Sequence, residues 1–370
     1  GTLSSGREWF LQWKTIDGET LASSSTPEIE VLLQGMCNKH TLLDLIKHFI
    51  VFEDDGGKIT KKLAAYHQYY AVKNAVKKTI QAASPDGDKK VGVIWHTQGS
   101  GKSLSMLFYT GKLVIEPDLA NPTIVVLTDR NELDDQLFNT FTRGNHLIRQ
   151  SPVQAESKEH LKQLLSSSAS GGIYFTTVQK FLPDKDQIKY PVLSERKNII
   201  FIADEAHRSH YGFAGGYAQY LREALPNASY IGFTGTPISL GDRNTVNIFG
   251  NYIDTYDIQR SVNDGNTVKI YYENRVIPLE FPEDMKDDAD TGFGEITEQQ
   301  EEKERENAKS RWSRLEALFR LEGRQTRLAK NLVEHFEARD DELDGKAMIV
   351  CMSRRICAEL YNEIIKLRPH

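Results

Sequence analysis

The chain has 370 residues, of which 39% are hydrophobic and 26% charged, and its formal net charge is −6. This length suffices for two domains with hydrophobic cores, and the composition is that of an ordinary soluble globular protein. No apolar run reaches the length of a membrane-spanning helix and no signal peptide is present, so we expect neither a membrane protein nor a secreted one. The three cysteines lack metal-ligand spacing, and reduced thiols in a cytoplasm are the simplest account of their odd number.

The first predicted region, residues 1–55, is an N-terminal connector. Its apolar spacing predicts a short helix near residues 28–33, started by Pro27, and a second helix over residues 41–52. An amphipathic helix follows over residues 64–76.

From residue 56 to residue 255, short apolar segments alternate with helical patterns. This alternation predicts an α/β fold, with a parallel sheet, right-handed connections and flanking helices. The predicted strands are residues 91–95, 124–127, 172–175, 199–203 and 230–233.

The most informative motif lies in residues 95–103, which read WHTQGSGKS after an apolar strand and before a helical pattern. Glycines in such a loop let the backbone turn and present a nest of N–H groups, which the positive end of the next helix extends. Lys102 would reach the β- and γ-phosphates of a nucleotide, and the Ser103 hydroxyl would ligate Mg²⁺. A Gly-Ser loop that contains a lysine by chance is the alternative, and His96 departs from the general motif, which has its first glycine there. The predicted phosphate-binding residues are Gly99, Ser100, Gly101, Lys102 and Ser103.

A second motif, residues 198–207 with the sequence NIIFIADEAH, has the pattern of a buried parallel strand that ends in two carboxylates. Sites in α/β sheets form at such strand ends. If this strand lies near the one that precedes the glycine loop, Asp204 can hold the water shell of Mg²⁺ while Glu205 polarises the attacking water. A surface Asp–Glu pair is the alternative. A metal cluster of His207, His210 and Asp204 is discounted, because no second ligand group of zinc-like spacing accompanies it.

The last third of the chain is expected to begin a second domain over residues 256–370. A turn at residues 263–266 precedes a predicted strand, residues 268–272, and the chain ends with a long helical stretch and a strand at 347–351. The helical stretch covers residues 311–339. Between the predicted strand at 268–272 and this helical stretch lies an acidic insertion, residues 284–310, which has ten acidic side chains against four basic ones. Its composition is typical of a solvated segment, and the rest of the chain is balanced in charge.

Taken together, these motifs resemble the superfamily 2 helicases and translocases, and within them the restriction (R) subunit of type I restriction–modification enzymes. The resemblance covers essentially the whole chain, most securely residues 60–275. The matching segments are EWFLQWKTID at 8–17, YHQY at 66–69, WHTQGSGKS at 95–103, IVVLTDRNEL at 124–133, DEAHRS at 204–209 and FTGTP at 233–237.

The resemblance implies a RecA-like ATPase domain with a P-loop and a DEAH box over residues 56–255, followed by the beginning of a second RecA-like domain. Gln68 resembles the glutamine that reads the adenine edge, since a carboxamide can donate and accept at once. An exposed polar position on its helix is the alternative. Thr128 and Arg130 resemble the first contact to the DNA backbone; without the family match they would be ordinary solvated loop residues.

Three further residues are implied to couple hydrolysis to DNA movement. They are His207, in the Asp-Glu-Ala-His segment, and Thr234 and Thr236, whose hydroxyls could sense the state of the phosphates. The Thr-Gly-Thr-Pro sequence could otherwise form an ordinary turn.

As a whole, the resemblance implies an ATP-dependent translocase that pulls duplex DNA, with ATP and Mg²⁺ as cofactors, in a bacterial or archaeal cytoplasm. The methylation (M) and specificity (S) subunits would be its partners, and cleavage would belong to a nuclease domain that precedes residue 1. Such motors complete their site with an arginine of the second domain, which the family places beyond the end of this chain. We therefore expect the chain alone to bind ATP–Mg²⁺ but to hydrolyse it slowly.

Two other function classes stay open. Another superfamily 2 helicase or remodeller, acting on DNA or RNA, would share Lys102, Asp204 and Glu205 and differ in its partner. A nucleotide-binding scaffold, in which ATP only orders an assembly surface, would share the glycine loop. Glu205 argues against the scaffold, because a pure binder needs no carboxylate that polarises water.

Overall fold

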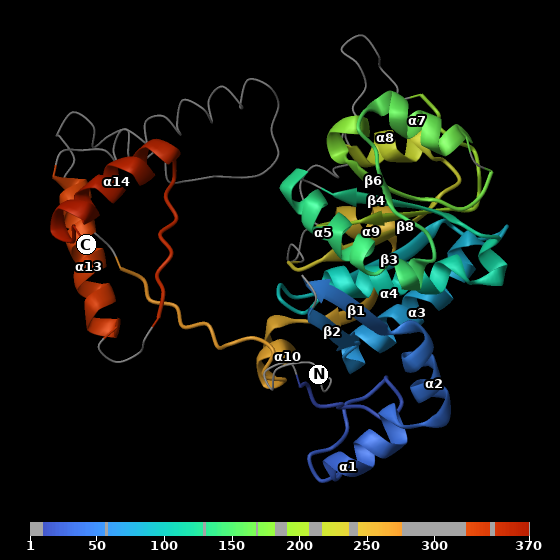
Figure 1. The fold of residues 1–370 in the computed structure, drawn as a ribbon, viewed down its shortest axis with the longest axis horizontal. Coiled ribbons are helices and arrows are strands. Elements are labelled where there is room, and N and C mark those ends of the chain that lie inside the picture. The colour runs from blue at the N-terminus through green and yellow to red at the C-terminus, as the bar shows by residue number, and fades with distance from the viewer. Residues whose placement is uncertain are drawn as a thin grey trace. The chain divides into compact units, whose positions relative to one another are not determined.

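The computed structural model describes residues 10–55, 58–128, 131–167, 169–181, 191–206, 217–236, 243–275, 323–340 and 345–369. The chain divides into two compact units, Gly1–Ile270 and Tyr271–His370 (Figure 1). Every helix among the described residues is too short or too polar to cross a lipid bilayer.

The first unit is built on a seven-stranded sheet with the strand order β5-β6-β4-β7-β8-β3-β9 (Figure 1). Every neighbouring pair in this sheet runs parallel, so the predicted parallel α/β fold is confirmed. Each of the five predicted strands is present, and β5 and β9 are additional strands at the two edges. The bounds are β3 (Lys90–His96), β4 (Thr123–Thr128), β5 (Val153–Gln154), β6 (Ile173–Thr177), β7 (Ile199–Ala203), β8 (Ser229–Thr234) and β9 (Tyr252–Tyr256).

Helices cover both faces of this sheet, which is why its central strands are apolar along their whole length. Side chains alternate across a strand, so Ile200 and Ile202 enter one core while Ile199 and Phe201 enter the other. The first core lies under α3 (Tyr66–Ala83), α4 (Lys102–Val114), α5 (Asn131–Arg143) and α6 (Asn145–Ile148). The second lies under α7 (Lys158–Ser167), α8 (Tyr217–Ala224) and α9 (Arg243–Phe249). Short 3-10 turns occur at Pro117–Leu119 and Val178–Phe181.

The segment before α3 contains two helices and a hairpin. The predicted first helix is present as α1 (Glu28–Val31), which continues into a π-helical turn, Leu32–Met36. The second, α2 (Lys39–His48), ends earlier than expected, because the chain turns into the antiparallel pair β1 (Ile50–Asp55) and β2 (Lys58–Leu63). The predicted helical end at residues 49–52 is therefore wrong: these apolar residues pair with a strand that local spacing does not reveal.

The predicted turn after α10 (Ile258–Asn263) is confirmed, and its Gly265 N–H donates to the carbonyl of Val262 at 3.0 Å. Residues 256–270, which the sequence analysis placed in the second domain, lie in the first unit.

The second unit is described as two helices, α13 (Arg324–Asp340) and α14 (Arg354–Leu367), with irregular segments. The helices are joined by a hydrogen bond of 2.7 Å from Thr326 Oγ1 to Glu363 Oε2. The predicted strands at 268–272 and 347–351 are wrong, because these residues have no neighbouring strand to pair with in the described part of the chain. The acidic insertion, 284–310, and the first part of the predicted long helix, 311–322, lie outside the described residues.

Candidate nucleotide-binding site

The glycine loop has the strand–loop–helix arrangement that the sequence predicts. β3 ends at His96 and α4 begins at Lys102, with residues 97–101 between them. Gly99 and Gly101 adopt left-handed backbone angles, with φ of +80° and +84°. A Cβ at position 101 would in addition lie 2.6 Å from Nε2 of Gln68, so any other residue there would displace the end of the Gln68 side chain.

Three carbonyl groups of this loop accept hydrogen bonds, and two of them, those of Ser100 and Gly101, accept from side chains of α3. Ser100 donates its N–H and its hydroxyl to the Thr97 carbonyl at 3.3 and 2.6 Å. The Ser100 carbonyl accepts from Nε2 of His67 at 3.2 Å, and the Gly101 carbonyl accepts from Nε2 of Gln68 at 3.0 Å. In a trans peptide the carbonyl and the next N–H point in opposite directions. The N–H groups of Gly101 and Lys102 therefore point away from α3, as an anion-binding nest requires.

Lys102 lies against the segment that follows β8. An added Cβ at Gly235 would lie 2.8 Å from Lys102 Nζ and 3.1 Å from Cγ of Gln98. Thr234 is 1% exposed, and its hydroxyl accepts from the N–H of Thr236 at 3.2 Å. Because β3 and β8 are neighbours in the sheet, the structure brings the predicted lysine and the predicted Thr-Gly-Thr segment together.

The two carboxylates follow the end of β7 at the same edge of the sheet. The N–H of Asp204 donates to the Leu127 carbonyl of β4 at 2.9 Å, and the N–H of Ala206 donates to Phe233 of β8 at 2.9 Å. Between them Glu205 adopts a left-handed φ of +48°, and its N–H donates to Oδ1 of Asp204 at 2.9 Å. This left-handed backbone conformation costs about 1–2 kcal/mol of free energy in a residue other than glycine. Residues with such conformations concentrate at functional sites.

Gln68 lies in the first turn of α3 and is 5% exposed, so the alternative of an exposed polar residue is wrong. Its Oε1 accepts from the N–H of Ala65 at 2.9 Å, while Nε2 donates to the Gly101 carbonyl. These two bonds use one of the two N–H donors and one of the two lone pairs of a carboxamide. Gln68 therefore links the start of α3 to the glycine loop.

Thr128 is fully buried at the end of β4, and its hydroxyl donates to the Thr176 carbonyl at 3.4 Å. The hydroxyl is therefore bonded within the sheet. The contact of Thr128 with DNA stays a prediction. Arg130 and His207 lie outside the described residues.

The donors available for a divalent cation are oxygens. Among the described residues, no group of three or more His, Cys, Asp or Glu side chains could hold a metal ion. The candidate ligands Ser103 and Asp204 instead offer one hydroxyl and one carboxylate, a set that suits Mg²⁺, which keeps several waters and binds substrate phosphates.

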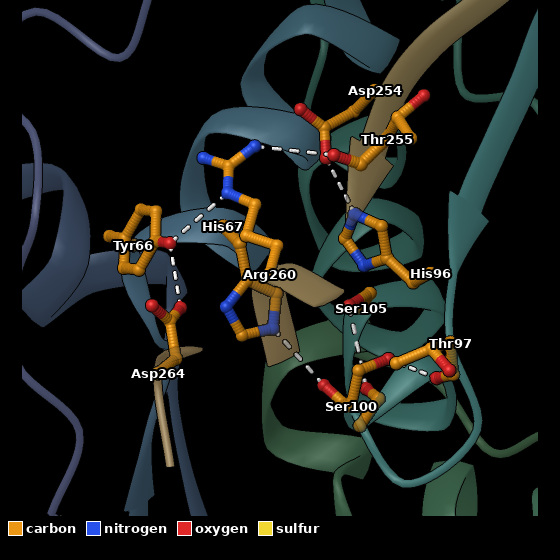
Figure 2. Close-up of polar contacts among 11 residues, drawn as sticks. Tyr66, His67, His96, Thr97, Ser100, Ser105, Asp254, Thr255, Arg260 and Asp264 are labelled. Atoms are coloured by element: carbon orange, nitrogen blue, oxygen red, sulfur yellow. Dashed lines mark hydrogen bonds and ion pairs between the residues drawn. The ribbon is translucent and has the colours of Figure 1, made fainter. Parts of the chain in front are cut away.

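A buried polar cluster behind the loop was missed by the sequence analysis (Figure 2). Asp264, in the turn after α10, accepts at Oδ2 from the hydroxyls of Tyr66 and Tyr256, at 2.7 and 2.9 Å. Its Oδ1 forms an ion pair of 2.7 Å with Lys14. Burial, together with the hydrogen bond to Asp264, raises the pKa of both tyrosines, which stay protonated as donors. Arg260 adds a bond from Nε to the Tyr66 hydroxyl at 3.3 Å.

Two histidines join this cluster to the loop. His96 is fully buried, and its Nε2 lies 2.7 Å from Oδ2 of Asp254 on β9. The ring of His67 stacks on Tyr256, with centroids 3.9 Å apart and planes 10° from parallel. Burial, with a smaller effect from His96, lowers the pKa of His67 to about 3, so its imidazole is neutral at physiological pH. The carbonyl acceptor at Ser100 requires the proton on Nε2. The residues of this cluster come from segments far apart in the chain, and only the Tyr66-His67-Gln68-Tyr69 match pointed to it.

Comparison with known proteins identifies the relatives of this chain. It is 49% identical, over an alignment of 382 positions, to the endonuclease subunit of the type I restriction enzyme HindI of Haemophilus influenzae, covering 100% of this chain and 35% of that protein. It is 40% identical over 344 residues to a Methanocaldococcus jannaschii protein assigned as the MjaIXP type I endonuclease subunit, covering 91% of this chain and 31% of that protein. The chain thus spans about a third of the length of these curated relatives.

Among solved structures, a Vibrio vulnificus fragment assigned as an HsdR subunit of a type I restriction enzyme matches 92% of this chain and 50% of that chain. Its TM-score is 0.48 and its sequence identity 18%. The resemblance to restriction subunits predicted from the motifs is confirmed by the curated relatives. A family model described as SWI2/SNF2 ATPase matches residues 67–306, which include the glycine loop, both carboxylates and the Thr-Gly-Thr segment. The chain belongs to the SWI2/SNF2 ATPase family.

Proposed function

We propose that this chain is the ATP-driven motor segment of the endonuclease subunit of a type I restriction enzyme. It would bind ATP with Mg²⁺ at residues 97–103, hydrolyse it, and use the cycle to move along duplex DNA. The observation that carries the proposal is the glycine loop itself, with its carbonyls tied to α3 and its amides turned to the other side. The relatives, endonuclease subunits by name, supply the biological setting.

In this proposal each residue near the loop has one task. The amides of the loop and the N-terminus of α4 bind the phosphates, and the Lys102 ammonium neutralises charge on the β- and γ-phosphates. Ser103 and Asp204 hold Mg²⁺, which supplies further charge neutralisation. Glu205 orients the attacking water and accepts its proton. Gln68, already bonded to Gly101, faces the adenine with its second donor and lone pair.

We assign movement on DNA to the segments at the ends of β4, β7 and β8, which lie at the sheet edge that carries the glycine loop. Thr234 ends β8 and Thr236 lies two residues beyond it, and Gly235 between them lies next to Lys102, so a change in the phosphates would be passed to both threonines through this segment. His207 would share this coupling role. Thr128 would position the loop that carries Arg130, and Arg130 would contact the DNA backbone.

The larger assembly is also part of the proposal. We place a nuclease domain before the connector of residues 1–55, ATPase domain 1 from residue 56 to residue 270, and the second RecA-like domain after it. The M and S subunits and duplex DNA would be the partners, in the cytoplasm of a bacterium or archaeon.

Calorimetric titration of the chain with ATP–Mg²⁺ tests the proposal. The parent should bind, and Lys102→Ala should bind at least about tenfold more weakly, since a charged contact to phosphate is lost. Lys112→Ala is the matched control, because Lys112 lies on the same helix but pairs with Asp44 at 2.7 Å. It should bind as the parent does. A parent that fails to bind, or equal affinity in the parent and Lys102→Ala, would overturn the proposal.

A second measurement addresses DNA. Fluorescence anisotropy should detect binding of duplex DNA that weakens steeply with salt and depends little on sequence, since translocases contact phosphates. Arg130→Ala should weaken this binding and lower its salt dependence. Binding that is insensitive to salt, or a preference for RNA, would favour a different superfamily 2 function.

A further inference from the structure

One side chain lies directly behind the phosphate-binding loop and has no role in the chemistry. His67, on the first turn of α3, is 3% exposed, and its Nε2 donates to the Ser100 carbonyl at 3.2 Å. Figure 2 shows this bond between the imidazole and the loop. Its neighbour Gln68 bonds the next carbonyl, that of Gly101. Two consecutive residues of α3 therefore hold two consecutive peptide groups of the loop.

The imidazole of His67 is fixed by rings on several sides. It stacks on Tyr256 at 3.9 Å, and it meets Tyr66 and His96 edge-on at 5.6 and 5.4 Å. Stacked and edge-to-face contacts at these distances stabilise one orientation of a ring. The donor that faces Ser100 therefore has a defined direction.

Asp264 holds this set of rings in place. Its Oδ2 accepts from the hydroxyls of both Tyr66 and Tyr256, and Lys14 neutralises its Oδ1. Tyr256 also bonds the loop through its main chain, since its carbonyl accepts from the N–H of Thr97 at 2.9 Å. The cluster thus holds the loop at two points, Thr97 and Ser100.

The consequence for the loop follows from peptide geometry. A carbonyl of Ser100 held toward α3 forces the N–H of Gly101 to point the other way. Gly101 has a left-handed φ and lacks a side chain, so nothing in its own conformation prevents a peptide flip at this position. The bond from His67 supplies that restraint from outside.

We propose that His67 is a positioning residue for nucleotide binding, held by Asp264, Tyr66 and Tyr256, which keeps the Ser100–Gly101 peptide in the orientation that presents the Gly101 N–H to a phosphate. This inference rests on the proposed function in one respect, the identity of the anion as a nucleotide phosphate. The restraint on the peptide itself is independent of any ligand.

The test compares three variants in the full chain. His67→Phe keeps an aromatic ring for stacking but removes the donor to Ser100. His67→Gln removes the ring but keeps an N–H donor at a similar reach. Thr79→Val is the matched control, because Thr79 is a fully buried residue of the same helix that bonds Ala75 and Tyr109, away from the loop.

Calorimetry with ATP–Mg²⁺ should show His67→Phe binding about fivefold to tenfold more weakly than the parent, the effect of one lost hydrogen bond that orients a ligand contact. His67→Gln should return to within about threefold of the parent, and Thr79→Val should match it. A purely structural role of His67 predicts the opposite order, in which His67→Phe binds ATP–Mg²⁺ more tightly than His67→Gln does. Parent-like affinity in His67→Phe, or no rescue by Gln, overturns the inference.

A ligand-free measurement separates this inference from the proposed function. In ¹⁵N-resolved spectra of the chain without nucleotide, the Gly101 amide should give one sharp signal in the parent and in His67→Gln. It should be broadened or doubled in His67→Phe, as the peptide samples a second orientation. An unchanged Gly101 signal in His67→Phe overturns the positioning role, whether or not ATP binds; failure of the parent to bind ATP counts against the proposed function alone.

Discussion

His96, the last residue of β3, has its Nε2 atom 2.7 Å from Oδ2 of Asp254 on the neighbouring strand β9. The imidazole is fully buried and the carboxylate side chain is 20% exposed, and the bond joins β3 to the edge strand β9 beside the glycine loop (Figure 2). His96 occupies the position where the general phosphate-loop motif has a glycine. The structure accommodates the larger residue because β9 provides a partner for its polar atom.

Removal of this partner should destabilise the first unit. Asp254→Ala leaves Nε2 of a buried imidazole without its bond and should lower the free energy of unfolding by about 1–3 kcal/mol. Asp254→Asn keeps an oxygen acceptor and should lower it less. Urea unfolding followed by circular dichroism measures both, with the exposed Asp118→Ala as control. Equal stability of Asp254→Ala and Asp118→Ala would show that the His96–Asp254 pair does not contribute to the stability of the first unit.

The two loop glycines should respond differently to alanine. Both have a left-handed φ, but an added Cβ meets nothing within 4 Å at Gly99 and meets Gln68 Nε2 at 2.6 Å at Gly101. Gly99→Ala should therefore lose only about 1 kcal/mol of stability, the backbone cost. Gly101→Ala should lose more and should bind ATP far more weakly, because Gln68 must move. Thermal unfolding and calorimetry on both variants check this, and equal losses would argue against the contact with Gln68.

Glu205→Gln should separate binding from turnover. The amide keeps the shape of the side chain but cannot accept a proton from water. In a longer protein that also carries the arginine of the second domain, single-turnover hydrolysis in the presence of duplex DNA should therefore fall by about 100-fold or more. Affinity for ATP–Mg²⁺ should change by less than about threefold. Loss of both together would instead indicate that Glu205 supports the site structurally, while unchanged hydrolysis would remove it from the mechanism.

His67 should make stability depend on pH. Its pKa is lowered to about 3 in the folded protein, against an ordinary value of about 6.5 in the unfolded chain. Below pH 6.5 the unfolded chain takes up a proton that the folded chain does not, so the stability contribution is present above pH 6.5 and is lost as the pH falls. Between pH 7 and pH 5 the parent should lose about 2 kcal/mol more than His67→Gln.

Urea titrations of the parent and His67→Gln at each pH measure this difference. The half-buried His48, whose pKa is also lowered by desolvation, is present in both proteins, so its contribution cancels. A difference that does not change with pH would mean that the pKa of His67 is the same in the folded and the unfolded protein.

Local patterns predicted the interior of the fold well. β7 runs over Ile199–Ala203, the range expected from its apolar run, because a strand buried on both faces is apolar at every position. The edge strand β9 was missed, since Tyr252–Tyr256 mixes polar and apolar residues. The hairpin of β1 and β2 was missed as well, because its charged strand, Lys58–Leu63, has no apolar run.

The sequence by itself determined the strand–glycine loop–helix segment and the order of its neighbouring motifs, because glycines, a lysine and a strand that ends in carboxylates are local features. Only the tertiary structure decided what holds that loop. Tyr66 and Asp264 are 198 positions apart, and His67 reaches Ser100 across 33 positions. Such contacts depend on which strands become neighbours, and no local spacing encodes that choice, since it is made by packing two layers of helices on one sheet.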